Sequence, residues 1–413
     1  MKALVIGSGA REHALGERLR QERWRVACAP GNAGIARRFP CLPLRLDDPA
    51  AAVALARAEE PDLVVVGPEA PLVAGLADRL AAGGFAVFGP TAAAARIEGS
   101  KAFAKEVMAE AGVPTAAHAT FDQPDAARAH ARSLGGRVVV KADGLAGGKG
   151  VAVCANVEEA EAAIDAALVR GELGEAGRRL VLEERLEGRE LSLMALCDGR
   201  SYVLLPPCQD YKRALDGDRG PNTGGMGAVS PPLVSPAPLG PLAEATIAPV
   251  VARLADLGTP FRGTLYAGLM LTAAGPRVLE YNCRFGDPET QVLVERIDGF
   301  LGEAMLAAAR GSLAGSRLGA RPGAAAGVVV CARGYPGAPR LGDPLLGIDA
   351  AEAVAPLRFA GVGGAPERPV TAGGRVVTVV GHGPDLPAAV ALAYRAAALV
   401  SFPGARFRGD IGR

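Results

Sequence analysis

Short apolar runs alternate with amphipathic stretches along the first part of the chain. The apolar runs cover residues 2–6, 25–29, 63–67 and 86–89. Between them, apolar residues recur with helical spacing near residues 12–20, 50–58 and 71–82. Alternation of strands and helices predicts a parallel sheet flanked by helices. We therefore expect a Rossmann-like α/β domain over residues 1–99.

The pattern changes at Ser100, a suitable N-cap for a helix that ends at Gly112, before Pro114. Further strands are expected at residues 137–142, 151–154, 180–184, 190–197 and 202–206, and a hairpin at 264–272 and 277–283. Helices are expected at residues 156–169, 242–257 and 291–310. Residues 207–236 lack a regular pattern and are rich in Gly, Pro, Asp and Asn. An irregular segment of that length inside a compact region is usually functional.

A smaller segment from residue 318 to the end again mixes β and α patterns, and the sequence shows no internal repeat. The chain is therefore expected to be a mixed α/β and α+β multidomain protein. We place its domains at residues 1–99, 100–317 and 318–413.

Composition narrows the class of protein. The 413 residues are 49% hydrophobic and 22% charged, with a formal net charge of +1. This balance gives no basic surface for nucleic acid and no polybasic membrane patch. No apolar run reaches the roughly 18 residues of a membrane span. The chain begins with a strand-like run rather than a signal peptide, so we expect a cytoplasmic protein.

The cysteines and histidines also favour a cytoplasmic protein and argue against a histidine-rich metal site. The seven cysteines are dispersed without a C-x-x-C pair, which is typical of reduced thiols in a cytoplasmic protein. With only four histidines, no histidine-rich metal site is expected.

Lysine is rare, and arginine supplies the rest of the 45 basic residues. The lysines are Lys2, Lys101, Lys105, Lys141, Lys149 and Lys212. We interpret them as candidates for places that need a compact ammonium group, with chance retention as the alternative. Lys101 and Lys141 should therefore not tolerate arginine. Lys2 and Lys105 should tolerate it, because neither lies in a glycine turn or at a strand end facing a site.

The first glycine-rich turn, GSGAR at 7–11, connects the first strand to the first helix. Backbone N–H groups at such a helix start bind anions. However, Glu12 stands where the dinucleotide fingerprint needs its third glycine, and Cys28 lies near the end of the second strand instead of an acidic residue. An NAD site is therefore disfavoured. A phosphate site with Arg11 and an ordinary tight turn both stay open.

The second glycine-rich turn, KADGLAGGKG at 141–150, joins two predicted strands. It is not a Walker A loop, because only three residues separate Gly144 from Gly148, and Gly150 follows the lysine where Ser or Thr is required. Glycine amides and a lysine charge suit a flap that closes over phosphates. We interpret this turn as a cover for ATP.

The third motif is Glu280-Tyr281-Asn282 in the predicted hairpin. Residues two apart on a strand point to one face, and a carboxylate beside a carboxamide offers hard oxygen donors for Mg²⁺. The pattern is weak alone, but the block CRFGDPET at 283–290 makes it much more specific.

Two polar segments complete the set. Residues 183–190 read EERLEGRE after a strand, and such a turn offers backbone groups to an adenine and Glu190 to ribose hydroxyls. A solvated acidic turn is the alternative. Residues 209–227 combine QDYKR with PNTGGMG, which suggests a loop that contacts substrate.

Together these blocks resemble the phosphoribosylamine–glycine ligase family of the ATP-grasp superfamily. The matching blocks are GxGxREH at 7–13, PGNAG at 30–34, VGPEAPL at 66–72, GSK at 99–101, KADG at 141–144, PNTGGMG at 221–227 and ExNCRFGDPET at 280–290. They cover essentially the whole chain, and the last two are highly specific. The resemblance implies a Rossmann-like substrate domain, a central ATP-grasp fold with a mobile ATP-covering subdomain at about 114–186, and a small C-terminal α/β domain.

The resemblance also implies the chemistry. ATP, glycine and 5-phosphoribosylamine would give ADP, phosphate and glycinamide ribonucleotide through a glycyl phosphate, in purine biosynthesis, with Mg²⁺ or Mn²⁺. Such a reaction needs positioning and electrostatics rather than an enzyme nucleophile. No nucleic acid, membrane or obligate protein partner is implied, while transient contact with neighbouring pathway enzymes stays open.

The family's functional residues map onto positions of this chain. The resemblance implies catalytic roles for Arg284, Lys141, Lys212 and Asp210. It implies ATP contacts from Lys101, Lys141, Gly144, Gly147, Gly148, Lys149, Gly150, Glu183, Glu184, Leu186 and Glu190. It implies substrate contacts from Gly9, Arg11, Glu12, Asn32, Glu69, Asp210, Lys212, Asn222, Gly224, Arg284 and Asp287, and metal ligands from Glu280 and Asn282.

One departure concerns the metal. The strand expected to pair with the metal motif reads LYAGLM at 265–270, and it supplies no carboxylate for a second Mg²⁺. Two other functions stay in view. A different ATP-grasp ligase fits the nucleotide motifs but fits residues 207–227 and 284–289 poorly. A non-catalytic nucleotide-binding regulator would have lost its metal ligands or phosphate lysines, and all are present.

Overall fold

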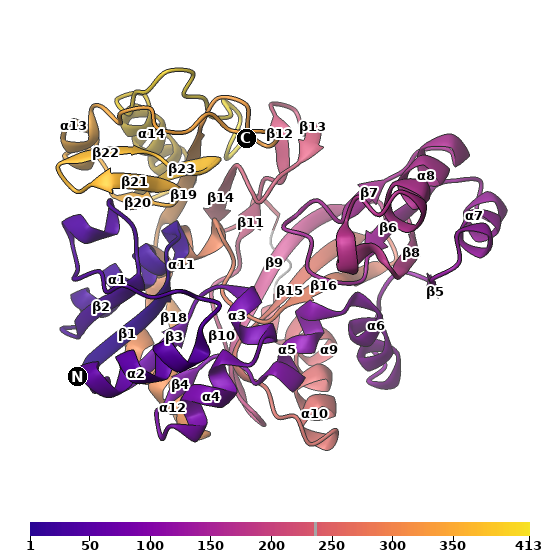
Figure 1. Cartoon of the computed structure of the whole chain (residues 1–413), viewed down its shortest axis with the longest axis horizontal. Coiled ribbons are helices and arrows are strands. Elements are labelled where there is room, and N and C mark those ends of the chain that lie inside the picture. Colours follow the sequence, from indigo (N-terminus) through magenta and orange to yellow (C-terminus); the bar gives the residue numbers. More distant parts are fainter. Residues whose placement is uncertain (235–237) are drawn as a thin grey trace.

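The computed structural model describes residues 1–234 and 238–413 (Figure 1). The first part of the chain forms a parallel sheet in the order β2-β1-β3-β4, which confirms the prediction from strand–helix alternation. Its strands are β1 (Lys2–Gly7), β2 (Arg25–Pro30), β3 (Leu63–Val66) and β4 (Val87–Phe88). The helices are α1 (Ala10–Gln21), α2 (Pro49–Glu59), α3 (Glu69–Val73) and α4 (Leu76–Ala82), with a 3₁₀ turn at Ile35–Arg37.

The single helix expected at residues 71–82 is wrong in detail, because the chain forms the two helices α3 and α4. Gly75 between them has a φ of +86°, a left-handed conformation that ends a helix. Helices α5 (Ala92–Gly99) and α6 (Lys101–Glu110) follow. Ser100 caps α6 by accepting a hydrogen bond from the Phe103 N–H, which confirms the predicted N-cap.

A subdomain stands apart from the rest of the molecule on the right of Figure 1. Its antiparallel sheet has the order β5-β8-β6-β7. The strands are β5 (His118–Phe121), β6 (Val138–Ala142), β7 (Val151–Val153) and β8 (Leu180–Glu184). Helices α7 (Pro124–Ser133) and α8 (Val157–Ile164) cover it, followed by a π turn at Asp165–Val169 and a 3₁₀ turn at Gly174–Gly177. It has its own hydrophobic cluster, so it is packed as a separate unit.

A second antiparallel sheet, in the order β10-β9-β15-β16, lies at the centre. Its strands are β9 (Arg189–Asp198), β10 (Tyr202–Leu204), β15 (Arg262–Thr272) and β16 (Gly275–Asn282), so the predicted hairpin is confirmed. The helix expected at residues 242–257 is divided into α9 (Leu239–Thr246) and α10 (Ala248–Asp256). Pro249 lies at this break, where its missing N–H interrupts the helical hydrogen bonds.

The helix expected at residues 291–310 is also divided, into α11 (Glu289–Arg296) and α12 (Leu301–Arg310). Between them β17 (Ile297–Asp298) pairs with β18 (Gly319–Ala320). Gly299 then takes a φ of +97°, which redirects the chain into α12.

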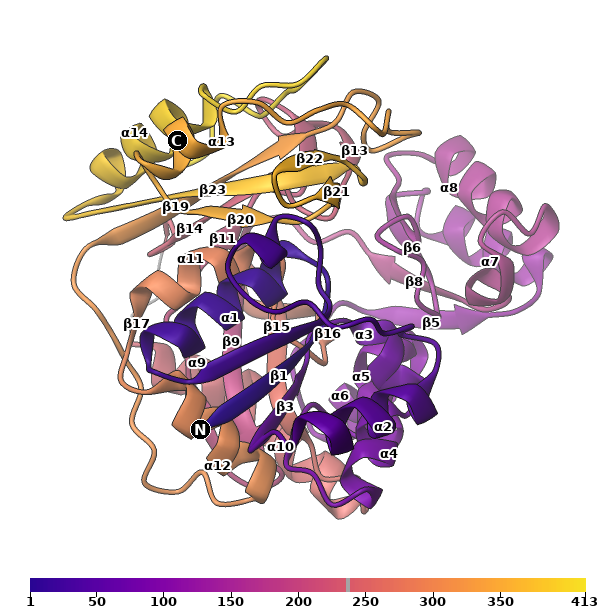
Figure 2. The same ribbon diagram turned by 60° about the vertical axis from the view of Figure 1, so that its left-hand side comes forward.

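The C-terminal segment contains the sheet β11-β14-β19-β23-β20, which Figure 2 shows lying above α1 and α11. Its own strands are β19 (Ala324–Cys331), β20 (Leu357–Phe359) and β23 (Arg375–Gly383). Helices α13 (Ile348–Glu352) and α14 (Leu386–Ala397) and the hairpin of β21 (Val362–Ala365) and β22 (Arg368–Thr371) complete it.

Residues 207–236 are more regular than expected. The segment forms β11 (Gln209–Asp210), β12 (Arg213–Leu215), β13 (Arg219–Asn222) and β14 (Gly227–Ser230); residues 235 and 236 lie outside the described part. Strand β14 pairs with β19, a strand about 100 residues later in the sequence. Such non-local pairing leaves no periodic signal, which is why the prediction failed here. The segment is thereby built into the C-terminal sheet.

None of the helices in the described ranges has the length and apolar character needed to cross a membrane.

Candidate active site

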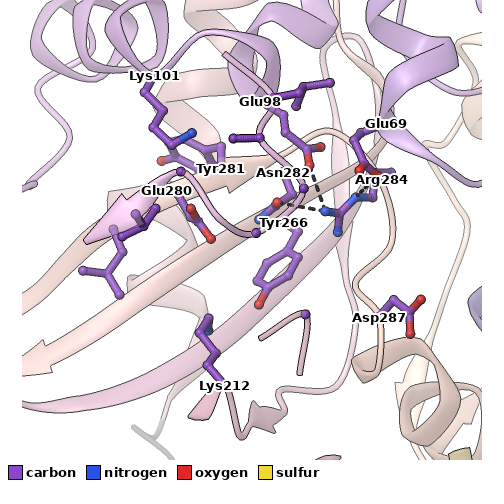
Figure 3. A pocket seen from close by; sticks show the side chains of 18 of the residues that line it. Glu69, Glu98, Lys101, Lys212, Tyr266, Glu280, Tyr281, Asn282, Arg284 and Asp287 are labelled. Atoms are coloured by element: carbon purple, nitrogen blue, oxygen red, sulfur yellow. Dashed lines mark hydrogen bonds and ion pairs between the residues drawn. The ribbon is translucent and has the colours of Figure 1, made fainter. Parts of the chain in front are cut away.

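One cavity of about 430 Å³ lies where the N-terminal sheet, the protruding subdomain, β16 and the C-terminal sheet meet (Figure 3). Many of the residues predicted from the sequence line it. They are Arg11, Glu69, Lys101, Gly147, Gly148, Gly150, Glu183, Asp210, Lys212, Gly224, Glu280, Asn282, Arg284 and Asp287. These residues come from positions between 11 and 287, and the fold gathers them at one place.

The other predicted residues do not line this cavity. They are Gly9, Glu12, Asn32, Lys141, Gly144, Lys149, Glu184, Leu186, Glu190 and Asn222. Some of them support the cavity wall through direct contacts, as described below. Lys149 is exposed in the flap, and the Glu184 carboxylate accepts a hydrogen bond from the Ala117 N–H at 2.8 Å.

The expected metal motif lies on β16. Glu280 pairs with Gly268 and Asn282 with Tyr266 in the hairpin, and both side chains line the cavity. Burial alone would raise the pKa of Glu280, but Lys141, Lys212 and Lys101 outweigh it and hold the pKa below its ordinary value. Figure 3 shows no interaction drawn to Glu280 among its labelled neighbours. A charged carboxylate beside an amide oxygen is a donor set that suits Mg²⁺.

No group of three His, Cys, Asp or Glu side chains arranged to hold a metal is found within residues 1–234 and 238–413. Among these residues, Glu280 and Asn282 form a pair of oxygen donors that could hold a metal only with further ligands. Mg²⁺ commonly takes its remaining ligands from water and substrate phosphates.

Two lysines lie close to Glu280 and to each other. Lys101 lines the cavity as the first residue of α6; its burial lowers its pKa although Glu280 opposes the shift. Lys141 Nζ donates to the Leu279 carbonyl at 2.9 Å and pairs with Glu183 Oε1 at 2.8 Å. Glu183 is 2% exposed. Its side chain therefore holds Lys141 against β16.

Lys105 is a correction to the sequence analysis. It is 2% exposed, lines the cavity, and shares the Glu183 carboxylate with Lys141 at 3.2 Å. Its Nζ also donates to Thr115 Oγ1 at 2.7 Å, and burial lowers its pKa to about 8. Lys105 lies on α6, neither in a glycine turn nor at a strand end, but the reason given for its tolerance of arginine does not consider a helix residue that faces the cavity. Its spacing of four residues from Lys101 on one helix was the available signal.

The glycine-rich turn is anchored at one end. Asp143 Oδ1 accepts from the Ala102 N–H at 2.7 Å, and its Oδ2 accepts from Arg179 Nε at 2.8 Å. Gly147 and Gly148 have φ values of +56° and +79°, with open space where a Cβ would stand. The turn is thus fixed at Asp143, while its glycine tip lies over the cavity.

A half-buried acid–base group lies on the other side. Lys212 Nζ donates to Asp210 Oδ1 at 2.8 Å and to Glu190 Oε2 at 2.7 Å. Burial raises the pKa of Asp210 to about 7; Lys212 opposes this shift, while Glu289 adds to it. The Tyr266 hydroxyl donates to Glu289 Oε1 at 2.6 Å. Glu190 is therefore engaged by Lys212 in this structure.

Arg284 is held by two carboxylates. Its Nε donates to Glu69 Oε2 at 3.2 Å and its Nη2 to Glu98 Oε1 at 2.8 Å (Figure 3). Its Nη1 and the Nη1 of Arg11 both donate to the carbonyl of Phe285, at 3.2 and 3.1 Å. The two guanidinium groups are thus brought together at one oxygen.

The side chains of Glu12 and Asn32 make hydrogen bonds within the protein. Glu12 Oε2 accepts from the Gly9 N–H and its Oε1 from Arg11 Nε, both at 2.6 Å. Asn32 Nδ2 donates to the carbonyls of Ser8, Phe359 and Ala360. The carboxylate of Glu12 occupies the start of α1, where the sequence left a phosphate site open. Glu12 therefore holds Arg11, whereas Asn32 joins the N-terminal turns to the end of β20.

Sequence reasoning missed several residues that line the cavity, namely Glu98, Lys105, Tyr266, Glu289 and Arg375. Tyr266 stands opposite Asn282 in the predicted hairpin, so register offered a signal. Glu98 and Arg375 reach the cavity from segments whose local sequence carries no such signal.

Comparisons with known proteins agree over the whole chain. The phosphoribosylglycinamide synthetase N domain matches residues 1–98, the ATP-grasp (A) domain residues 99–290, and the C domain residues 325–413. A phosphoribosylamine–glycine ligase from Streptomyces coelicolor is 48% identical, covering 100% of this chain and 98% of the relative. One from Rhizobium meliloti is 44% identical with the same coverage.

Solved structures extend the likeness. A phosphoribosylamine–glycine ligase from Thermotoga maritima has a TM-score of 0.87 and 35% identity, covering 99% of both chains. The biotin carboxylase domain of a Hydrogenobacter thermophilus 2-oxoglutarate carboxylase, solved with MgADP, has a TM-score of 0.72 at 19% identity, covering 98% of this chain and 91% of that chain, and shares the fold alone. The chain therefore belongs to the phosphoribosylglycinamide synthetase family.

Proposed function

We propose that the chain is an ADP-forming ligase that joins glycine to 5-phosphoribosylamine, giving glycinamide ribonucleotide and phosphate. The observation that carries the proposal is the meeting of the Glu280–Asn282 pair with Arg284, Asp210 and Lys212 in one cavity. The full-length relatives named phosphoribosylamine–glycine ligase support the choice of substrates. This activity belongs to purine biosynthesis.

The nucleotide side of the site holds ATP in this proposal. Lys101 and Lys141 neutralise the phosphates, and the tip of the glycine turn closes over them. The end of the strand at residues 183–186 binds the adenine. Glu190 separates from Lys212, and its carboxylate then accepts a hydrogen bond from a ribose hydroxyl. Glu280 and Asn282 hold Mg²⁺, or Mn²⁺ with the same oxygen donors. When bound, the metal neutralises negative charge on the phosphates.

The first step transfers the γ-phosphoryl group of ATP to an oxygen of the glycine carboxylate, which releases ADP and leaves glycyl phosphate. Arg284 lies beside that carboxylate and orients it through its own fixed pairing with Glu69 and Glu98. A guanidinium locked in this way needs no reorganisation when charge develops.

In the second step, the amine nitrogen of phosphoribosylamine attacks the acyl carbon, and the carbon–oxygen bond to phosphate breaks. Asp210 accepts the proton that the nitrogen loses, and its pKa of about 7 suits this exchange. Arg11, Glu69, Gly224 and Asp287 surround the phosphoribosyl part.

We further propose that residues 1–99, 100–317 and 318–413 act as domains, with residues 114–186 as the moving cover. A cytoplasmic location is consistent with seven free cysteines. We also propose that ligation requires no obligate protein partner. Transient contact with neighbouring enzymes stays a prediction.

Isotope transfer tests the proposed route. With glycine labelled by ¹⁸O in its carboxylate, one label is expected in the released phosphate and one in the amide of the product. ADP release should also require all three substrates. Labelled product with unlabelled phosphate would rule out glycyl phosphate, and ADP formed equally well with another amine acceptor would favour a different ATP-grasp ligase.

A further inference from the structure

A single arginine from the C-terminal segment lines the cavity. Arg375 opens β23, and its guanidinium contacts two separate segments of the wall. Its Nη1 donates to the carbonyls of Gly224 at 2.5 Å and Asp287 at 2.7 Å, and its Nη2 pairs with Asp287 Oδ2 at 3.1 Å. One guanidinium therefore joins the turn around Gly224 to the start of α11.

The other polar group of Gly224 is also held by the C-terminal segment. Its N–H donates to the Tyr335 hydroxyl at 3.0 Å. A Cβ added to Gly374, the residue before Arg375, would overlap the ring of Tyr335. The absence of a side chain at this position lets the tyrosine and the arginine approach Gly224 together.

The turn around Gly224 leads directly to the acid–base group. The Thr223 N–H and Oγ1 both donate to the Lys212 carbonyl at 2.8 Å, and the Gly225 N–H donates to Thr223 Oγ1 at 2.9 Å. Gly225 has a φ of +109°, and a Cβ there would overlap Cδ of Pro288. Contacts therefore run without a break from Arg375 through Gly224 and Thr223 to Lys212.

Asp287 is fixed through both carboxylate oxygens, since its Oδ1 accepts from Gln291 Nε2 at 2.8 Å. Burial would raise the pKa of Asp287, but Arg375, Arg11 and Arg284 outweigh burial and lower it. These three arginines come from the N-terminal, C-terminal and central parts of the chain. Only Arg375 forms an ion pair with the Asp287 carboxylate among the described residues.

We propose that Arg375, assisted by Tyr335, is a positioning residue for the phosphoribosylamine side of the site. It holds Asp287 and the 223–225 turn at a fixed separation, so the C-terminal segment completes that half of the cavity. This inference rests on the proposed function. Arg375 acts through Gly224 and Asp287, because its hydrogen bonds are already made to those groups.

Arg375→Lys tests the inference. The variant keeps the charge, but one ammonium cannot reproduce a planar fork that reaches three acceptors. The expected result is a KM for phosphoribosylamine raised at least tenfold, with the KM for ATP within twofold and an unchanged melting temperature. Tyr335→Phe keeps the ring and removes the hydroxyl, so a rise of about threefold in the same KM is expected.

Arg368→Lys is the matched control, because Arg368 is exposed on β22 of the same segment. It should leave every constant unchanged. Two results overturn the inference: an Arg375→Lys enzyme with wild-type constants, or equal rises in the KM for ATP and for phosphoribosylamine. If Arg375→Lys does not fold, Tyr335→Phe decides alone by the same criterion. A wild-type enzyme that forms no glycinamide ribonucleotide refutes the proposed function instead.

Discussion

The cationic side chains on the two sides of the cavity are paired within the protein in different ways. We call Lys101 and Lys105, together with Lys141 behind the cavity wall, the lysine half, and Arg11, Arg284 and Arg375 the arginine half. In the lysine half, two ammonium groups share the single carboxylate of Glu183, while Lys101 faces the cavity. In the arginine half, every guanidinium is already paired with a carboxylate and with a backbone carbonyl.

This difference matches what each half must do. In the proposed reaction, the lysine half holds phosphates whose geometry changes as the γ-phosphoryl group moves. Compact ammonium groups with rotatable donors tolerate that change. The arginine half orients small substrates, and locked planar groups do so without loss of entropy at the moment of reaction. The chain uses arginine almost everywhere else, so its choice of lysine here is informative.

The largest effect is expected at the border between the halves. Glu280→Gln or Asn282→Leu should abolish ligation, because the first removes the carboxylate charge and the second removes the amide oxygen that would bind Mg²⁺. The fold should be unchanged, since both residues line the cavity. Steady-state rates at ordinary Mg²⁺ concentration and circular dichroism check this. A near-normal kcat in either variant would contradict the metal assignment.

A pH profile tests the base on the substrate side. Asp210 accepts a proton only when ionised, so kcat/KM for phosphoribosylamine should fall as the pH drops below about 7. Asp210→Asn should lower kcat/KM about 100-fold, the lower end of general-base effects. It should also remove the acid limb of the pH profile, which is the fall in kcat/KM below about pH 7. Glu190→Gln removes a nearby negative charge and should shift the limb to lower pH. A limb near pH 7 that persists in Asp210→Asn would show that another group titrates.

The lysine half should reject arginine. Lys101→Arg, Lys141→Arg and Lys105→Arg should each lose at least tenfold in kcat/KM, which is about 1.4 kcal/mol of transition-state stabilisation. Lys105 is expected to be sensitive to arginine as well, because it is buried against Glu183. Lys2→Arg is the control, since Lys2 pairs with Glu59 far from the cavity. Equal behaviour of all four variants would remove the distinction between the halves.

The contrast between Lys101 and Lys105 shows what the sequence could predict. Local patterns predicted the parallel sheet, the hairpin and the cap at Ser100, because each depends on neighbouring residues. Glu280 was placed in the site by its strand motif and Arg284 by the family resemblance, and both line the cavity. Lys105 was missed because its importance comes from Glu183, 78 positions away.

Partners distant in the sequence explain the other errors. Strand β14 was expected to be irregular, because its partner β19 lies in the C-terminal segment. Glu98 and Arg375 reach the cavity through contacts with residues 283–284 and 287, which no periodicity reports. Whole helices were predicted where Gly75 and Pro249 interrupt them, since apolar spacing continues across such breaks.

The glycine-rich turn next to the lysine half should be mobile. Without nucleotide, residues 145–150 should exchange amide hydrogens quickly, because Gly147 and Gly148 lie in open space. An ATP analogue with Mg²⁺ should slow this exchange. Asp143, whose N–H donates to the Arg179 carbonyl, should be protected in both states. Unchanged exchange at 145–150 would contradict the role of the turn as a flap.

The smallest effect is expected behind the arginine half, where α1 meets the C-terminal sheet. His13 is buried there, and its Nδ1 accepts a hydrogen bond from the Phe359 N–H at 3.0 Å. Burial, with Arg358 and Arg38 adding to it, holds the pKa of His13 well below its ordinary value of 6.5. Below pH 6.5, the unfolded chain therefore binds a proton that the folded protein does not, and stability falls.

Between pH 7.5 and pH 5.5 this group should cost the folded state about 1.4 kcal/mol, the most that one histidine can contribute over that interval. His13→Asn should lose less stability over the same interval, as measured by melting temperature at both pH values. His382→Asn, at an exposed position on β23, is the control and should follow the wild type. If His13→Asn loses as much stability as the wild type, the acid sensitivity of this interface lies in another group. The stability of the interface behind the arginine half would then not depend on keeping His13 neutral.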